Sequence, residues 1–469
     1  RRRMLGATAV MASGTLASRV LGFVRTVLVA FALGNATAQG DAFTLATFVP
    51  NSLYMIVAGG ALNTVLVPQI VRHVRGDADG GEAFLNRIMT AFLLALAAVT
   101  ALAWAFAPQV MGLWMGGAWH SDAMAEHRAA LFGLALLTMP QLFFYGAFFL
   151  VGQVLNARER FGPMMWAPIA NNVVQIVVLG AYAMAWAGQA DHSQPFTRAQ
   201  VLVLGLGSTL GIVAQTLLLL PALRAAGVRY RPRFDLRGQG LGATFHLAKW
   251  AIGYVLLTQA ASIVVTRLAS SATVSDPARP GPGVLAYQEA QLTWLLPHSL
   301  LTVSLATALL PAASRLAASG DLRGVGAETA RTLRLAHAFI VPAAVGLIVL
   351  AGPFAQLVFG NGAGAADWHA VAATLVCFAV GLVPYTIQYV YLRGFYALED
   401  MRSAFGLQVW ISAANIAAAV GWVWVDPDPA TVAPRLALTY SASYLLGAAI
   451  TYRALARRLP GLDAREIGA

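Results

Sequence analysis

Apolar stretches of roughly 18 to 30 residues recur along the whole chain, separated by short segments that carry most of the charge. A helix rises about 1.5 Å per residue, so each stretch is long enough to cross a hydrocarbon core about 30 Å thick. None of the stretches shows the alternating pattern of a membrane barrel strand. The pattern therefore predicts an all-α integral membrane protein.

About twelve of these stretches are expected to be transmembrane helices. Their ranges are 5–33, 41–71, 84–108, 129–155, 164–187, 200–221, 245–268, 284–312, 331–351, 369–393, 402–425 and 433–453. A polar linker over 222–244 lies between the sixth and the seventh. We therefore expect an N-terminal six-helix lobe over 1–221 and a C-terminal six-helix lobe over 245–469.

Short motifs of the first half recur about 244 residues later in the second half. The pairs are Met139-Pro140 with Val383-Pro384, Phe161, Trp166 and Asn171 with Phe405, Trp410 and Asn415, and 64–68 with 307–311. Each expected lobe has an even number of spans, so both lobes enter the membrane in the same sense and form parallel repeats. Two such lobes around a central cavity are typical of transporters that alternate between inward-open and outward-open states.

The distribution of Lys and Arg predicts the orientation of the helices. With the N-terminus inside, 24 of the 31 Lys and Arg residues fall in cytoplasmic segments and only four in outside loops. Cytoplasmic loops of membrane proteins carry such an excess, so both termini are expected in the cytoplasm. The same bias accounts for most of the net charge of +11, and no nucleic-acid partner is needed to explain it.

The amino-acid composition is also typical of an integral membrane protein. The chain is 58% hydrophobic and only 11% charged, whereas soluble domains carry about 25% charged residues. Cys377 is the only cysteine, which excludes an internal disulfide and a thiolate metal cluster. The first stretch carries Arg19 and Arg25, unlike the uncharged core of a secretory signal, so we expect it to be a retained helix.

Three arginines lie inside expected spans, where an unpaired charge is costly. Arg19 is near mid-membrane, Arg25 is six residues further along the same helix, and Arg267 lies at nearly the repeat-equivalent position in the seventh span. Guanidinium groups bind phosphate oxygens through two parallel hydrogen bonds, so a phosphate or pyrophosphate head group is the expected cargo. The alternatives are structural ion pairs, such as Arg267 with Glu289, or snorkelling to an interface.

Other polar residues in the spans allow a functional and a structural interpretation. Asp41 begins the second span, where it would also serve as a helix cap. Asn51 follows Pro50 inside a span, where an amide also serves interhelical hydrogen bonding. The chain contains no HExxH motif, no P-loop and no nucleophile elbow, so it is not expected to be an enzyme.

The first 75 residues resemble the MurJ (MviN) family of lipid II flippases, which belongs to a superfamily that includes multidrug, oligosaccharidyl-lipid and polysaccharide exporters. The resemblance is carried by the run from Ser18 to Arg25 with the letters SRVLGFVR, by Asp41-Ala42-Phe43, by Pro50-Asn51 and by Val67-Pro68. Weaker similarity extends through Asn156, Pro163 and Gly394-Phe395-Tyr396.

This resemblance implies a two-lobed body with a cationic cavity in the bacterial cytoplasmic membrane. The implied activity is to move lipid II, a peptidoglycan precursor linked to undecaprenyl pyrophosphate, from the inner to the outer leaflet. The residues at the family's functional or cavity positions are Ser18, Arg19, Arg25, Asp41, Asn51 and Arg267. The implied partners are lipid II, membrane lipids and, as a further expectation, cell-wall synthesis proteins.

The sequence also departs from the family pattern. Tyr54, Met55 and Gly59 stand where the family often has two arginines and a glutamate, and Gln291-Leu292 replaces an aspartate–arginine pair. The family commonly has fourteen helices, against the twelve expected in this chain. No cofactor is expected, and the ranges 250–268 and 402–425 lack the acids with which some members bind sodium, so membrane potential is the alternative energy source.

Four alternative functions remain open at this stage. The nearest is a flippase for another polyprenyl-linked glycan. A cation-coupled drug exporter would favour carboxylates over arginines in its cavity. A membrane scaffold for cell-wall synthesis would not need Arg19, and a membrane-embedded transferase would need larger outside loops than this chain offers.

Overall fold

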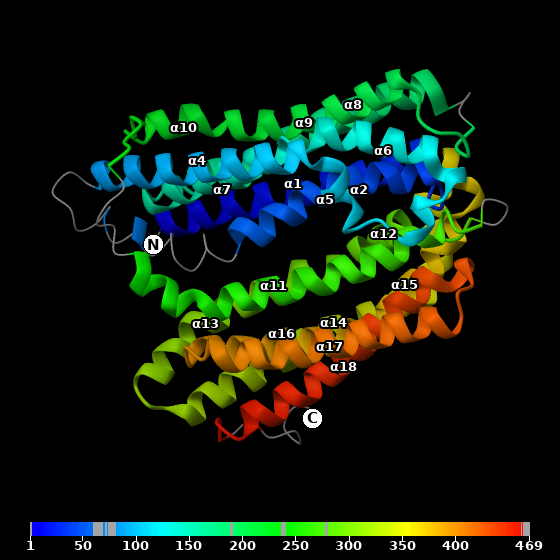
Figure 1. Ribbon diagram of the computed structural model, residues 1–469. Helices are drawn as coiled ribbons and strands as arrows, with labels where there is room; N and C mark the ends of the chain where they lie inside the picture. Colours follow the sequence, from blue (N-terminus) through cyan, green and yellow to red (C-terminus); the bar gives the residue numbers. More distant parts are fainter. Residues whose placement is uncertain are drawn as a thin grey trace. The chain divides into compact units, whose positions relative to one another are not determined.

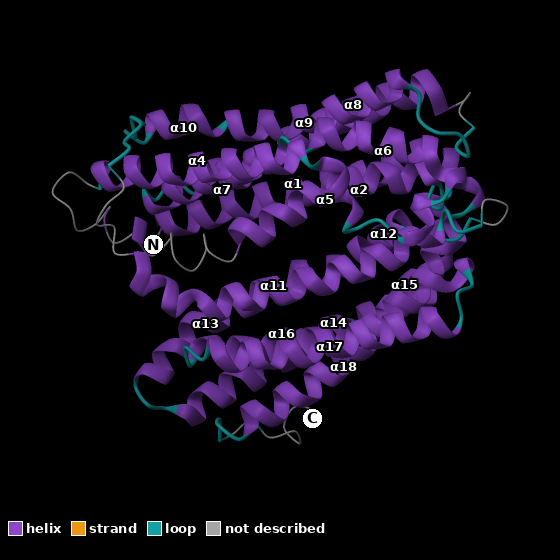
Figure 2. Ribbon diagram, in the orientation of Figure 1, coloured by secondary structure: helices purple, strands orange, loops and turns teal. Residues whose placement is uncertain are grey.

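The computed structural model describes residues 2–59, 69–70, 73, 81–187, 191–235, 241–276, 280–460 and 462 (Figure 1). Its regular structure in these ranges is helical throughout, with loops between the helices (Figure 2). The chain forms two compact units: unit 1 is Arg1–Gly34 with Ala38–Val255, and unit 2 is Asn35–Thr37 with Leu256–Ala469. The prediction of an all-α membrane protein is confirmed, while the division into lobes over 1–221 and 245–469 stays a prediction.

The main helices of unit 1 are α1 (Arg2–Leu33), α2 (Ala38–Tyr54), α4 (Glu82–Ala105), α5 (Ala107–Gly112), α6 (Ala125–Thr138), α7 (Gln141–Ala157), α8 (Gly162–Tyr182), α9 (Arg198–Leu217) and α10 (Leu219–Ala225). Helix α11 (Leu241–Ala272) begins in unit 1 and ends in unit 2. Unit 2 continues with α12 (Val284–Pro297), α13 (Val303–Ala318), α14 (Leu322–Phe359), α15 (Trp368–Val380), α16 (Leu382–Ala397), α17 (Met401–Val425) and α18 (Val432–Ala456).

Nine helical segments of the described residues are long and apolar enough to cross a membrane, or ten if the bent pair α15 and α16 forms one span. Together with that bent pair, the nine segments correspond to ten of the twelve spans expected from the sequence. The other two are α2, followed by the short π-helix Met55–Gly59 before the described residues break off, and α18, which has 25 residues but is not among the nine. The repeat motif at 64–68 lies outside the described residues.

A proline in α2 is accommodated by a hydrogen bond from another helix. Pro50 lies inside α2 and has no N–H to donate to the carbonyl of Ala46, one turn earlier. The hydroxyl of Thr138 on α6, which is fully buried, donates to that carbonyl instead, at 2.6 Å. Since lipid offers no replacement partner, this bond removes the cost of a bare carbonyl in the membrane.

Small residues on α9 let it pack closely on α8. A methyl group built on Gly207 would lie 2.4 Å from Val178, and one on Gly211 would lie 2.4 Å from the side-chain oxygen of Asn171. Helices in lipid associate through such close contacts, because no hydrophobic effect drives them together there. Unit 1 therefore has a tight α1–α8–α9 layer, with α8 packed against both neighbours.

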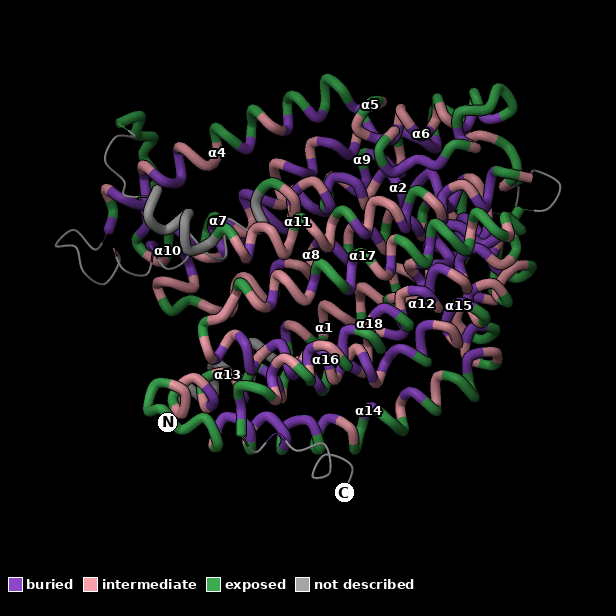
Figure 3. Tube along the Cα trace, turned by 60° about the horizontal axis from the view of Figure 1, so that its bottom comes forward, coloured by how far each residue is buried: buried purple, intermediate pink, exposed green. Residues whose placement is uncertain are grey.

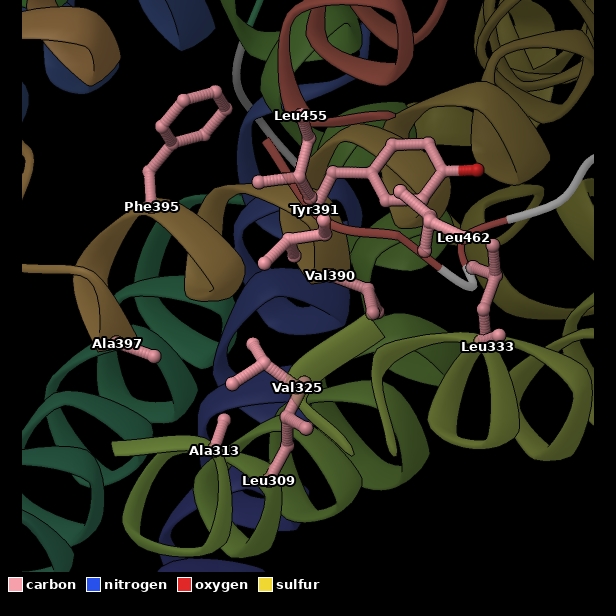
Figure 4. Close-up of a cluster of buried hydrophobic side chains, with 12 residues drawn as sticks. Leu309, Ala313, Val325, Leu333, Val390, Tyr391, Phe395, Ala397, Leu455 and Leu462 are labelled. Carbon is pink, nitrogen blue, oxygen red and sulfur yellow. The ribbon is translucent and has the colours of Figure 1, made fainter. Parts of the chain in front are cut away.

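Unit 2 has its own apolar core at one end of its helices. Side chains from α13, α14, α16 and α18 meet there, including Leu309, Leu333, Val390, Phe395 and Leu455 (Figure 4). Along α14, buried and exposed stretches alternate (Figure 3). The exposed positions include apolar side chains such as Val349 and Leu357, as expected of a helix with one face toward lipid.

Residues 35–37, which belong to unit 2, are held by hydrogen bonds within that unit. The carboxylate of Asp367 accepts hydrogen bonds from the backbone N–H groups of Asn35 and Ala36, at 3.1 and 2.7 Å. The fully buried side chain of Asn35 donates to Asp367 and to the carbonyls of Phe359 and Gly364. This anchor fixes the backbone of residues 35–37 to the loop before α15.

Candidate functional site

Helix α1 carries three of the six expected site residues, and it runs from Arg2 to Leu33 without a break. Its exposed large apolar side chains, Leu16, Val20, Val24 and Phe31, share one face, because they lie three to four residues apart or multiples of this. With about 100° between neighbouring residues, Arg25 projects from roughly the opposite face, and Arg19 from the flank of the exposed face. The helix therefore presents its two arginines to different surroundings.

Arg19 is partly buried, and its guanidinium forms no hydrogen bond or ion pair with any residue that the structure describes. The structural ion pair considered as an alternative is thus not found within the described ranges. An arginine has five N–H donors in a planar fork. Those of Arg19 are available for a ligand with several oxygen acceptors.

Arg25 lies in a more enclosed place, beside α7. It is partly buried and close enough to the hydroxyl of Tyr145 for an electrostatic interaction. The ring of Tyr145 stacks on that of Tyr54 from α2 at a centroid distance of 6.1 Å, and Phe149 lies 6.3 Å from Tyr54. Tyr54 stands where the resemblance suggested an arginine, so an aromatic ring takes the place of a second charge near Arg25.

Ser18 fixes α1 to α8 through Asn172. The side-chain amide of Asn172 donates to the carbonyl oxygen of Ser18 at 2.9 Å and to its hydroxyl at 3.4 Å. The side-chain oxygen of the preceding residue, Asn171, instead accepts from Gln175 within α8 at 3.0 Å. The residue that bridges the helices is its neighbour, because the two side chains lie about 100° apart on α8.

Asp41 and Asn51 occupy opposite environments on α2. Asp41 is fully buried in the first turn of the helix, where a carboxylate is favoured by the partial positive charge of the helix N-terminus. Asn51 is exposed and follows Pro50. Of these two, only Asn51 offers its side chain to a ligand in this conformation.

Arg267 lies on α11 in unit 2, where its side chain is exposed and its carbonyl accepts from the hydroxyl of Ser270. Glu289, its suggested partner, is fully buried on α12. Arg25 belongs to unit 1, so the pairing of Arg25 and Arg267 across two lobes stays a prediction.

Within unit 1, the structure brings Ser18, Arg19 and Arg25 onto one helix beside residues that the sequence did not single out. These are Asn172 and Tyr145; Tyr54, noted from the sequence only as a departure from the family pattern, joins them through its ring contact with Tyr145. The sequence does contain a signal for Asn172. Two adjacent amides, Asn171 and Asn172, on an otherwise apolar helix point toward two different neighbouring helices. In the described ranges, no three His, Cys, Asp or Glu side chains lie close enough to hold a metal ion.

This arrangement is suited to binding an anion. It offers one arginine with free donors, a second arginine beside a phenol hydroxyl, and amide and hydroxyl groups along the same helix. Such donors match a phosphate or pyrophosphate, whose oxygens accept several hydrogen bonds at once.

Comparison with known proteins agrees with the resemblance at the start of the chain. The family model described as "Lipid II flippase MurJ" matches residues 29–469. The chain is 28% identical over 459 residues to a "Probable lipid II flippase MurJ" of Haemophilus influenzae, covering 94% of this chain and 84% of that protein. A protein of the same description from Vibrio cholerae is 28% identical over 463 residues, covering 97% and 83%.

Solved structures share the fold. "Lipid II flippase MurJ, inward closed conformation" superposes with a TM-score of 0.74 at 19% identity, covering 95% of this chain and 87% of that one. An inward-facing multidrug resistance transporter of the MATE family, in the MOP superfamily, gives a TM-score of 0.72 at 12% identity, covering 94% of each chain. With the family model spanning nearly the whole sequence, this chain belongs to the lipid II flippase MurJ family, whose members are transporters rather than enzymes.

Proposed function

We propose that this protein moves lipid II from the inner to the outer leaflet of a bacterial cytoplasmic membrane by alternating access. The single observation that carries the proposal is Arg19, which lies within a membrane-spanning helix and has no partner among the described residues. A charged arginine in that position is costly unless it meets water or an anion. A pyrophosphate-linked lipid would supply the anion and carry an apolar chain suited to the surrounding bilayer.

Arg19 is proposed to bind the pyrophosphate first, through the two parallel N–H donors of its guanidinium. Arg25 and the hydroxyl of Tyr145 would form a second binding point, six residues further along α1. Ser18 is proposed to act mainly through its bond with Asn172, which holds the α1 backbone beside Arg19. Asn51 and Arg267 are proposed cargo contacts, and Asp41 is proposed to position α2 from its buried place.

The orientation follows from charge: both termini are proposed to lie in the cytoplasm, because cytoplasmic segments would then hold most of the Lys and Arg residues. Sodium is not proposed as a coupling ion, since the ranges 250–268 and 402–425 lack the acidic residues with which some family members bind it. Membrane potential is the proposed energy source. Cell-wall synthesis proteins are proposed as partners, a role that would be independent of Arg19.

The test replaces Arg19 in a bacterium depleted of its own lipid II flippase. We expect Arg19→Ala to reduce lipid II reaching the outer leaflet at least tenfold, since one charge-assisted hydrogen bond is worth roughly that factor. Arg19→Lys keeps the charge without the fork and should give an intermediate rate. The measurement is the fraction of lipid II accessible to an externally added degrading enzyme, with membrane abundance of each variant checked in parallel.

Arg224→Ala is the matched control, because Arg224 is an exposed arginine at the end of α10 and lies outside the site. It should support wild-type translocation. Undiminished translocation by Arg19→Ala would refute the proposed site and would favour a scaffold role. If a different polyprenyl-linked glycan accumulated in the inner leaflet on depletion of this protein, the cargo would be that glycan.

A further inference from the structure

Unit 1 has an apolar groove between α6 and α9, outside the site described above. Its volume is about 650 Å³, within the range of roughly 300–1,000 Å³ typical of ligand pockets. Helices α6 and α9 pack against each other (Figure 1). The lining includes Gly133 and Leu137 from α6 and Phe196, Val201 and Leu202 from the other side.

Among the described residues, the only ionisable side chains that line this groove are two of opposite charge. They are Glu126, in the first turn of α6, and Arg198, the first residue of α9. Both are exposed, and neither forms an ion pair with a residue in the described ranges. The nearby Arg128 does not compete for Glu126, because its guanidinium donates to the carbonyls of Trp119 and Ser121.

The groove leads onto a face of α9 that suits a lipid chain. Leu202, Leu206 and Leu210 are all exposed and lie four residues apart, so they form a stripe along the helix. Arg198 precedes Leu202 by four residues and therefore lies at the end of the same stripe. A lipid lying along these leucines would have its phosphate at the level of Arg198.

Two further observations suit a lipid in this groove. Trp104 of α4 is exposed, and its indole N–H donates to the carbonyl of Leu136, which lines the groove about 15 Å along α6 from Glu126. The indole therefore lies at the level of the acyl chain, where it adds apolar surface beside the groove. Arg198 adds a positive charge to the N–H groups at the start of α9, which favours an anion at that place.

We propose that this groove binds a phosphatidylethanolamine molecule, distinct from the transported cargo. Its phosphate lies on Arg198, its primary ammonium on Glu126, and one acyl chain fills the groove and continues along the leucines of α9. The charge pair selects this head group: a purely anionic lipid brings its phosphate near Glu126 without an ammonium to neutralise the carboxylate. The quaternary ammonium of phosphatidylcholine has no N–H to donate to the carboxylate.

The test is native mass spectrometry of the purified full chain, titrated with phosphatidylethanolamine, phosphatidylglycerol or phosphatidylcholine of identical acyl chains. We expect phosphatidylethanolamine to bind most tightly. Arg198→Gln should lower its affinity roughly tenfold. Glu126→Gln should abolish the preference over phosphatidylglycerol, and Arg224→Gln, at the other end of the same helical segment, should change nothing.

A second variant fills the groove without touching the charges. A methyl group on Gly133 would lie 3.3 Å from Val201, so Gly133→Met should block the acyl chain and lower binding of the phospholipid. A photoactivatable phosphatidylethanolamine with a diazirine on its acyl chain should label α6 and α9 in the wild-type protein and not in this variant. Equal binding of the three lipids, or binding unaffected by Arg198→Gln and Glu126→Gln, would overturn the proposal; neither result bears on lipid II transport.

Discussion

Arg19 and Arg25 lie six residues apart on α1, yet their surroundings differ. Arg25 is partly buried beside the hydroxyl of Tyr145, whereas Arg19 has no partner among the described residues. A guanidinium that already interacts with a protein group gains less from a ligand than one that does not. Arg19 should therefore contribute more to cargo binding, and Arg25 more to the local structure.

Asn172 contacts both the backbone carbonyl and the side-chain hydroxyl of Ser18, and substitutions can separate the contributions of these two contacts. The shorter of its two contacts, 2.9 Å, is to the carbonyl oxygen of Ser18, and the hydroxyl lies at 3.4 Å. Ser18→Ala keeps the shorter contact, so it should lower the free energy of unfolding by only a few tenths of a kcal/mol. Asn172→Ala removes both and should cost about 1 kcal/mol. Thermal unfolding of the purified variants measures the difference, and a larger loss for Ser18→Ala would contradict it.

At the scale of the helix, irregular positions are held by groups from neighbouring helices. Pro50 interrupts the hydrogen bonding of α2, and Thr138 on α6 supplies the missing donor. Asp400 begins α17 by accepting the N–H of Ser403 at 2.9 Å, and it also pairs with Arg458 beyond α18. Each of these contacts joins a helix to another part of its own unit, so its loss should loosen that packing.

The role of Thr138 predicts a non-additive pair of substitutions. Thr138→Val leaves the carbonyl of Ala46 without its donor and should lower the free energy of unfolding by about 1–3 kcal/mol. Pro50→Ala restores the N–H that this carbonyl lacks, so adding it to Thr138→Val should recover much of the loss. The measurement is a double-mutant cycle by thermal or denaturant unfolding.

Thr47→Val is the matched control for this cycle. Among the described residues, the hydroxyl of Thr47 donates only to carbonyls of its own helix, at 2.9 Å to Phe43 and 3.2 Å to Thr44. Its removal should have a small effect that Pro50→Ala does not change. Strictly additive effects of Thr138→Val and Pro50→Ala would show that the hydroxyl does not replace the missing N–H.

The lowered pKa of Asp400 predicts that the protein loses stability in acid. Burial raises the pKa of its carboxyl, but hydrogen bonds from Ser403 and the pair with Arg458 outweigh this and bring the pKa below its ordinary value. Its contribution to folding is therefore present above the unfolded pKa of about 4 and is lost as pH falls through the lowered folded pKa. Asp400→Asn keeps an oxygen that caps the helix but removes this titration. Between pH 7 and pH 3, the unfolding midpoint should fall less for Asp400→Asn than for the wild type; equal falls would contradict the assignment.

At the scale of the whole molecule, periodicity and charge predicted the helical class, and the first-helix motif predicted the family. These predictions succeeded because the length of a span and the arginines of α1 can be identified from one segment of the sequence alone. The partners of those segments depend on packing, which the sequence does not state. Nothing local marks Thr138 as the donor for Ala46, or chooses Asn172 over Asn171 as the bridge to α1. The aromatic contact of Tyr54 with Tyr145 was missed for the same reason.

The orientation of the chain is a whole-molecule prediction that one labelling experiment can decide. Cys377 is the only cysteine, so Cys377→Ser gives a background without thiols. Ala123 is exposed in a segment expected outside, and Ser319 is exposed in one expected inside. A membrane-impermeant maleimide should label Ala123→Cys in intact cells, and Ser319→Cys only after permeabilisation.

The two positions control for each other, since both are exposed near the ends of helical segments and should react equally in detergent. The positive-inside bias that predicts this result acts mainly through short loops near the ends of spans. The reversed labelling pattern would place both termini outside and put most Lys and Arg residues on the outer face. Because Arg19 lies within α1 in either orientation, such a result would reverse the direction proposed for transport while leaving the binding role of Arg19 intact.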